Sequence, residues 1–428
     1  MTVGKSLLPI GTILACTLCG LVSAEDPLLP IRFSGYADLG LVLTDDAVSW
    51  LDAGTGKGRY GADRTGGDDF KAVVPEFVLI SELMLGASAT AHLQLKYDDE
   101  QRHSVDIGEA YLLYRSPPRP DLRWRLKIGT FLPPMSLENR AIGWTSPYTL
   151  SSSALNAWLG EEIRINGADL RFLFSYHATD ITLSGAAYIG NDAAGTLMAY
   201  RGFAVHDREL ALFDDAPLPR FQTAIINPRG PFRGQADTFE PLHEIDGRAG
   251  FYTGITLDND AWGRFLLYLY DNNADPEAFN RTAGQYAWHT RFITVGYRGD
   301  VADRLTLIVQ ALYGDTVMGS RVPPKDKRVT DVDYLTAYGL LSKVHRQWRY
   351  TARLEYFENR DRDTMRRNYD NNESGWAATT TVMFKPIERI KLALEIQYLD
   401  HERPVRRFTG APIRLDEFSA RLNLRWFF

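Results

Sequence analysis

Apolar and polar residues alternate one by one in many short segments of this chain of 428 residues. In residues 391–398, every second residue is Leu, Ile or Tyr, and the residues between them include Lys, Glu and Gln. The same alternation occurs in 90–98, 122–129 and 305–311. Successive side chains of a β-strand point to opposite faces, so each segment predicts a strand with one apolar and one polar face. Helical periodicity is hard to find, and an all-β fold is therefore expected.

The polar faces of these strands carry long charged side chains, which helps to separate two kinds of β-protein. A soluble sandwich also alternates, but its inward face packs a dry core. Here the apolar faces often end in an aromatic residue, and the chain has 21 Tyr, 21 Phe and 9 Trp. Aromatic residues at strand ends are typical of the interfacial girdles of a membrane barrel. We therefore favour a transmembrane antiparallel β-barrel over a soluble sandwich.

About sixteen strands are predicted. They are expected at 31–44, 74–86, 90–98, 104–115, 122–131, 162–176, 180–190, 245–258, 263–271, 286–299, 303–315, 331–344, 348–358, 375–385, 389–400 and 413–428. Links after even-numbered strands are brief, whereas most links after odd-numbered strands are long and polar, as short periplasmic turns and long extracellular loops would be. Because no water satisfies backbone groups inside a bilayer, the first and last strands are expected to pair and close the sheet.

The first 24 residues are expected to form a cleaved signal peptide. Lys5 precedes an apolar stretch at 10–21, and small residues at 22–24 suit a cleavage site. Residues 25–428 would then form one barrel domain in the outer membrane. Cys16 and Cys19 both fall in the leader, so a redox or metal role for their CxxC spacing is disfavoured. A lipoprotein anchored through Cys16 is the less favoured alternative.

Charge and motifs argue against several classes of function. The formal net charge is −6, which argues against nucleic acid as a partner. Nucleophile-elbow, HExxH and phosphate-loop motifs are missing from the sequence, so no enzyme and no cofactor are expected. Residues 271–275 begin like a calcium loop, but Pro276 and Thr282 stand where such a loop needs Gly and Glu. A plain polar loop without a metal is favoured there.

Three short segments resemble those of bacterial outer-membrane porins. The C-terminal residues 422–428 alternate and end in Phe428, which resembles the signal read by the barrel-assembly machinery. Residues 33–38 look like the first strand of many porins, and 126–139 are similar to a strand and loop of the phosphate-selective porin superfamily. The resemblance implies a diffusion channel among lipid and lipopolysaccharide, with a homotrimer as a frequent assembly. A lysine-rich constriction ring is not recognisable, so phosphate specificity does not follow.

The third long connection, 132–161, is the main candidate for a functional loop. In sixteen-stranded porins the third loop narrows the lumen, so the resemblance implies a constriction loop here; a cap outside the barrel is the alternative. Its candidate residues are Glu138, Arg140, Trp144, Tyr148, Asn156, Glu161 and Glu162. The polar strand faces supply the candidate pore-lining residues Arg123, Arg125, Lys127, Arg171, Arg264, Arg349, Arg353, Glu355, Glu395, Arg421 and Arg425. Connection 191–244 is expected to be a long extracellular loop.

These residues lead to an expectation about function. A cationic wall favours anions, although inward carboxylates such as Glu355 and Glu395 would pair with some of the arginines. We expect passive diffusion of small hydrophilic solutes with a mild preference for anions. Two alternatives stay open: a surface receptor or adhesin with a plugged lumen, and a lipid-modifying barrel enzyme.

Overall fold

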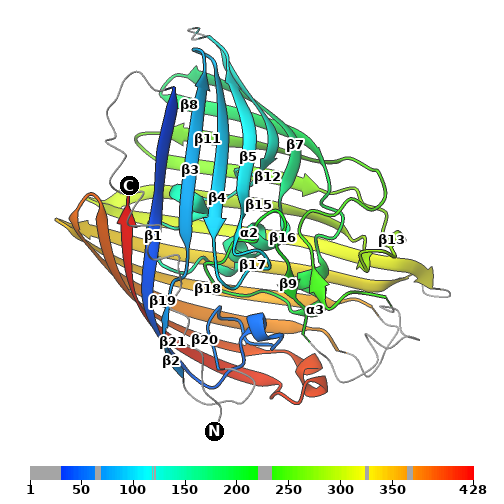
Figure 1. Cartoon of the computed structure of the whole chain (residues 1–428). Coiled ribbons are helices and arrows are strands. Elements are labelled where there is room, and N and C mark those ends of the chain that lie inside the picture. The colour runs from blue at the N-terminus through cyan, green and yellow to red at the C-terminus, as the bar shows by residue number, and fades with distance from the viewer. Residues whose placement is uncertain are drawn as a thin grey trace.

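A computed structural model describes residues 30–62, 69–117, 119, 122–219, 234–322, 327–363 and 370–428. In these residues the chain forms one closed antiparallel barrel (Figure 1). Its strands are β1 (Ile31–Thr44), β2 (Asp69–Val73), β3 (Phe77–Leu85), β4 (Ala89–Tyr97), β5 (Val105–Arg115), β6 (Arg123–Phe131), β7 (Ile165–Tyr176), β8 (Thr179–Ile189), β11 (Gly250–Asn259), β12 (Gly263–Asp271), β15 (His289–Ala302), β16 (Leu305–Val322), β17 (Lys327–His345), β18 (Trp348–Asp361), β19 (Glu373–Ile387), β20 (Ile390–Glu402) and β21 (Arg414–Phe427). The expected signal peptide lies outside the described residues.

The barrel closes through β1 and β21, which pair from Tyr36↔Phe427 to Thr44↔Ser419. The pairing of the first and last strands predicted from the sequence is therefore confirmed. Along β21, Leu422 and Leu424 face outward, whereas Asn423 between them is buried. The same alternation around the ring gives the barrel an apolar outer surface and a polar inner one.

The second predicted strand, 74–86, is only partly correct: β3 begins at Phe77, and β2 lies in residues that we expected to belong to the long connection after the first strand. β2 pairs with the second half of β1 and β3 pairs with its first half, and residues 74–76 between them are not in a strand. Pro75 has no N–H to donate to a ladder, so the strand breaks there. Asp38 N donates to Glu76 O at 2.9 Å, so pairing with β1 resumes directly after the break. With β2 and β3 counted as one interrupted strand, the barrel has the sixteen strands predicted.

The strand ends divide the barrel into two ends. At one end the strands are joined by short turns, such as 303–304 between β15 and β16 and 346–347 between β17 and β18. At the other end the connections are long, as predicted. The exception is the β16–β17 hairpin, whose arms of 18 and 19 residues run well beyond the predicted bounds of 303–315 and 331–344. These arms stay paired from Thr316↔Val332 to Val322↔Lys327, with an irregularity between Met318 and Arg321.

Three inner segments, residues 45–62, 132–164 and 190–218, pack against the inner wall near the long connections. They carry η1 (Trp50–Asp52), η2 (Ile142–Trp144), α2 (Ala154–Glu162) and α3 (Thr196–Tyr200), and Figure 1 shows α2 within the ring of strands. We expected 191–244 to be an extracellular loop, but its residues 191–211 are almost all buried. Its apolar side chains, such as Met198 and Phe203, pack with wall residues of the barrel. Among the described residues, no helix is long and apolar enough to cross a membrane.

The remaining elements are small. They are the two-residue pairs β9 (Ala216–Pro217) with β10 (Thr238–Phe239) and β13 (Phe279–Asn280) with β14 (Gln285–Tyr286), and the turn η3 (Pro404–Phe408). All of them lie in the long connections, so the short-turn end of the barrel stays uncovered by secondary structure of its own.

Candidate functional site

The lumen has two halves that differ in how their charges are compensated. We call the half nearer the long connections the loop half and the half nearer the short turns the turn half. In the loop half the inner segments bring carboxylates to wall arginines. In the turn half several wall cations have no carboxylate partner among the residues that the structure describes. The two halves are described in turn.

Arg353 on β18 is the centre of the loop half. Its guanidinium is fully buried and contacts Glu138 Oε1 at 2.6 Å and Glu355 Oε1 at 2.9 Å. It also donates to the carbonyl oxygens of Ser151 and Ser152 at 2.7 and 3.2 Å. A buried guanidinium needs partners for all of its donors, and this one has them. Arg353 therefore fixes segment 132–164 to the wall and does not present a free charge to a solute.

Neighbouring wall carboxylates hold the same segment. Glu395 on β20 accepts from Leu150 N at 2.6 Å and Ser151 N at 2.9 Å. Glu355 accepts from Ala154 N at 2.6 Å, at the start of α2. Within the segment, Asn156 donates to Glu138 at 2.9 Å. The predicted inward direction of Glu355 and Glu395 agrees with these contacts, but both serve to position the inner segment.

The charged residues at the end of α2 join two inner segments. Glu161 pairs with Arg201 at 2.5 Å and lies 3.1 Å from the His206 ring nitrogen, and both partners belong to segment 190–218. Burial would raise the pKa of Glu161, but Arg201 and His206 outweigh burial and lower this pKa to about 2. Burial raises the pKa of the adjacent Glu162 to about 7, against the effect of its hydrogen bonds from Leu197 N, Trp158 and Gly195 N.

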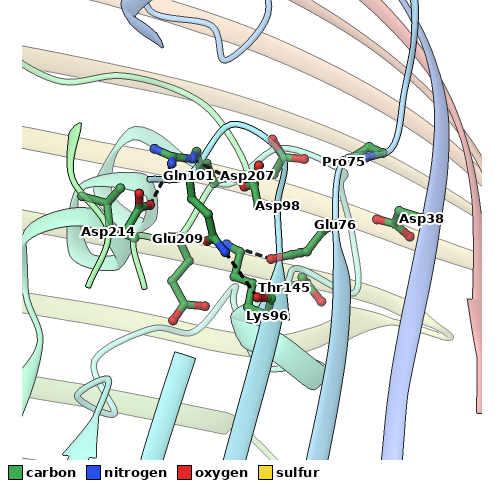
Figure 2. A network of polar contacts seen from close by, with 12 residues as sticks. Asp38, Pro75, Glu76, Lys96, Asp98, Gln101, Thr145, Asp207, Glu209 and Asp214 are labelled. Carbon is green, nitrogen blue, oxygen red and sulfur yellow. Dashed lines mark hydrogen bonds and ion pairs between the residues drawn. The ribbon is translucent and has the colours of Figure 1, made fainter. Parts of the chain in front are cut away.

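A second buried network lies beneath β1 to β4. Figure 2 shows Lys96 of β4 pointing toward Glu76, and the two are 2.8 Å apart. Lys96 also donates to Glu209 O at 2.7 Å, which ties segment 190–218 to this side of the wall. Arg425 pairs with Asp38 at 2.6 Å between β21 and β1. The strand break at Pro75 places Glu76 in this network.

Glu373 at the start of β19 connects the other two inner segments. It contacts Lys57 Nζ of segment 45–62 and accepts from Phe203 N of segment 190–218 at 3.0 Å. Arg421 on β21 pairs with Asp207 at 2.6 Å. Of the predicted pore-lining residues, Arg353, Glu355, Glu395, Arg421 and Arg425 are thus all buried in contacts of this kind.

The turn half is different. Arg123 is exposed and Arg125 is half-buried on β6, and neither has a carboxylate partner among the described residues. Lys127 Nζ on the same strand lies 4.1 Å from the centre of the Tyr111 ring and 4.8 Å from that of Phe131. An aromatic face attracts a cation but carries no formal charge that could neutralise it, so the basic residues of β6 contribute positive charge to the inner wall.

The other predicted residues of the turn half include both paired and unpaired cations. Arg171 pairs with Asp169 at 2.8 Å, and Arg264 pairs with Asp258. Arg349 and the loop residue Arg140 have no ion pair among the residues that the structure describes. Trp144 is half-buried and packs against the main hydrophobic cluster. Tyr148 is nearly fully buried and lies beside Arg349.

Two groups of residues were missed by the sequence analysis. Arg298 on β15 donates to the Tyr148 hydroxyl. The alternation of β15 could have identified Arg298 as an inward residue, because Thr294 and Gly296 on the same face of the strand are buried. Asp192, Glu244 and Asp246 each place an oxygen within 4.8 Å of the others at the junction between β8 and β11. Asp192 accepts from the backbone N–H groups of Ile245 at 2.6 Å and Asp246 at 3.2 Å. No signal in the sequence brings these carboxylates together.

Asp192→Asn is expected to remove part of the pH dependence of folding stability. Burial, followed by the nearby Glu244 and Asp246, raises the pKa of Asp192 from 3.8 to about 7. The folded state then holds a proton that the unfolded state has lost, so stability falls as the pH rises from about 4 to about 7. Asparagine keeps the oxygen that accepts from residues 245 and 246 but cannot ionise. We compare the free energy of unfolding of the variant with that of the native chain. This difference should move in favour of the variant by about 1 kcal/mol between pH 5 and pH 8, after allowance for solvent screening.

The measurement is urea unfolding in detergent at both pH values, with a chelator present to remove divalent cations. Asp260→Asn, in an exposed short turn, is the matched control. It should leave the free energy of unfolding unchanged at both pH values. Equal pH slopes for the native chain and Asp192→Asn would contradict the expectation.

Together these features are those of a bacterial outer-membrane β-barrel. More particularly, residues 234–422 match the family described as putative beta-barrel porin-2, OmpL-like. No curated protein sequence matches the chain.

Solved structures similar to this one are also outer-membrane proteins. They include OmpT of Vibrio cholerae without its loop L8, at 8% identity over 93% of this chain and 99% of that chain, with a TM-score of 0.49. An anion-selective porin from Comamonas acidovorans is 9% identical over 93% of this chain and 99% of that chain, with a TM-score of 0.48. OprB of Pseudomonas putida is 9% identical over 92% of this chain and 94% of that chain, with a TM-score of 0.48. At this distance, the fold rests on the strand pairing of this chain itself.

Proposed function

We propose that this barrel is a passive channel for small hydrophilic solutes and that it prefers anions. The observation that carries the proposal is the difference between the two halves of the lumen. Charges of the loop half are paired and buried, so they contribute little net field to a passing solute. The turn half has Arg123, Arg125 and Lys127 on one strand without carboxylate partners among the described residues. Unpaired cations beside water attract anions and repel cations.

The inner segments define the narrow part of the route in this proposal. Segment 132–164 is held to the wall by Arg353 and Glu395, so it is a fixed constriction and not a mobile flap. A solute that enters from the loop side would pass this segment before it meets the cations of the turn half. No catalytic step is part of the proposal, because transport along such a route needs only binding and release.

A plugged receptor is the second candidate, and the dense packing of the inner segments favours it. Segment 190–218 is buried over most of its length. Planar-bilayer recordings of the purified, folded protein separate the two functions. Discrete open-channel steps are expected for the channel, and their absence would leave the receptor.

Replacing Arg123, Arg125 and Lys127 together by glutamine is expected to abolish the anion preference. The substitution removes three positive charges from the lumen and puts a shorter, neutral polar side chain at each position. The reversal potential under a potassium chloride gradient should shift toward that of an unselective or cation-preferring channel. The control replaces Arg360, Lys385 and Arg414 by glutamine, which removes the same charge from exposed outer positions. A reversal potential unchanged in the first variant would count against the cationic wall.

The partners in this proposal follow from the outer surface. Phe428 packs against Phe77 with ring centres 5.7 Å apart, so the last strand presents aromatic residues at the short-turn end. We propose that the barrel-assembly machinery reads this strand, and that lipid and lipopolysaccharide cover the apolar face. A homotrimer is the proposed assembly, and its test is the mass of the detergent-extracted complex.

A further inference from the structure

We propose that Tyr148, Arg298 and Arg349 form a discrete binding site for an oxyanion group, such as a phosphate or sulfate, in the turn half of the lumen. This inference deepens the proposed function, on which it rests for the access of the ligand, by naming the class of anion. It differs from a diffuse cationic wall because it requires convergent hydrogen-bond donors and saturable binding.

The first observation is the contact geometry around Tyr148. Arg298 Nε donates to the Tyr148 hydroxyl oxygen at 3.0 Å. The Arg349 guanidinium carbon lies 5.1 Å from the centre of the Tyr148 ring, and Arg349 Nη1 donates to Ser342 Oγ at 2.9 Å. These contacts fix one part of each guanidinium and leave its other N–H groups to bind a ligand. The Tyr148 oxygen accepts from Arg298, so its own proton remains available for donation.

The second observation is an excess of positive charge. Arg298 and Arg264 are directly opposite each other in the β12–β15 pair, and like charges in that position are destabilising. Arg264 is compensated by Asp258. For Arg298 and Arg349, the described residues provide no carboxylate within ion-pair distance. Arg140 is a third cation near this pair, because its pKa is lowered by burial and by the charges of Arg264 and Arg298.

The third observation is the contrast with Arg353, four residues after Arg349 on the same face of β18. Arg353 is fully buried and saturated by two carboxylates and two carbonyl oxygens. Arg349 and Arg298 are only half-buried and have no such partners. The contacts of Arg353 are explained by its role in holding segment 132–164 to the wall. No such role accounts for the uncompensated charges of Arg298 and Arg349.

The chemistry of the donors defines the ligand. Every free group at the site is a donor, and none is an acceptor, so a cation or a neutral sugar without an acidic group is a poor match. Planar guanidinium forks bind two oxygens of one anionic group at once. An oxyanion with three or four oxygens can accept from both arginines and from the Tyr148 hydroxyl. Chloride offers one centre and would gain less from this arrangement.

The test uses inorganic phosphate as the probe and has two readouts. Equilibrium dialysis of the full-length, detergent-extracted barrel against radiolabelled phosphate measures binding without any current. In bilayers, phosphate is expected to reduce the chloride current along a saturating curve. The double variant R298Q/R349Q should bind phosphate about a hundredfold more weakly, since each of the two lost arginines removes charged hydrogen bonds that contribute about a factor of ten. The control R360Q/R414Q, which removes two positive charges from exposed outer positions, should keep the phosphate affinity of the native barrel.

The outcomes separate the site from the channel. Saturable binding that R298Q/R349Q loses, in a barrel without conductance, would overturn the proposed function and support the site. Conductance with no saturable phosphate binding, or binding that R298Q/R349Q retains, would overturn the site. Should R298Q/R349Q fail to assemble, the single variants R349Q and Y148F replace it. Each is expected to weaken binding severalfold, and native affinity in both overturns the inference.

Discussion

Replacing Arg353 by methionine is expected to lower the free energy of unfolding of the barrel by about 3–5 kcal/mol. Methionine can fill the space of the aliphatic part of the arginine side chain but cannot donate, so Glu138 and Glu355 would remain as buried carboxylates without their cation. Ser151 and Ser152 would also lose the donor to their carbonyl oxygens. Removal of one member of a buried ion cluster costs far more than the cluster contributes to stability, because the remaining charges stay desolvated.

This loss is measured by urea unfolding in detergent at pH 7. Arg360→Met is the matched control on the same strand, because the exposed Arg360 pairs with Glu358 at the surface and such pairs contribute little to stability. Adding Glu138→Gln and Glu355→Gln to Arg353→Met should restore part of the stability, since the uncompensated charges are then gone. Equal losses for Arg353→Met and Arg360→Met would show that the buried cluster is not what holds segment 132–164.

Replacing Glu373 by glutamine is expected to raise the single-channel conductance severalfold. The Glu373 carboxylate holds Lys57 and the backbone of Phe203, so it attaches segments 45–62 and 190–218 to the wall. A neutral amide leaves Lys57 buried without a counter-charge, which favours its movement into water. Segments that leave the wall widen the route through the loop half.

Planar-bilayer recordings at a fixed salt concentration measure this effect. The control is Glu358→Gln on the neighbouring strand, where the partner Arg360 is exposed and no inner segment is attached. Steps of native size and native noise in Glu373→Gln would mean that the inner segments stay in place without this attachment.

The strands of this barrel were predictable because a membrane gives each side chain only two environments. Alternation in β20 and β21 predicts which residues face lipid, and the closing pair with β1 follows from the need to satisfy the backbone. The break at Pro75 was missed, because we predicted a strand across 74–86, although proline in a ladder signals an edge or an interruption. The extension of β16 and β17 was also missed, because strand residues beyond the membrane no longer need to alternate.

The contents of the lumen were not predictable. Segment 132–164 was identified by its position and length, but its anchor joins Glu138 to Arg353 across 215 residues of sequence. Segment 190–218 looks like an ordinary long loop because its charges find their partners only in the folded ring. Arg349 and Arg353 are equivalent by alternation, yet one is saturated and the other is not. Such differences depend on which inner segment lies against each wall residue.

The long β16–β17 hairpin is expected to project from the membrane on the side of the long connections. A tilted strand needs about 9–11 residues to cross the hydrocarbon layer, whereas the arms of this hairpin have 18 and 19. At about 3.3 Å per residue, the excess of about eight residues corresponds to roughly 25 Å of additional strand length beyond what the hydrocarbon layer requires. Antibodies and bacteriophages that approach the bacterium would meet this stiff projection before they reach the mouth of the barrel.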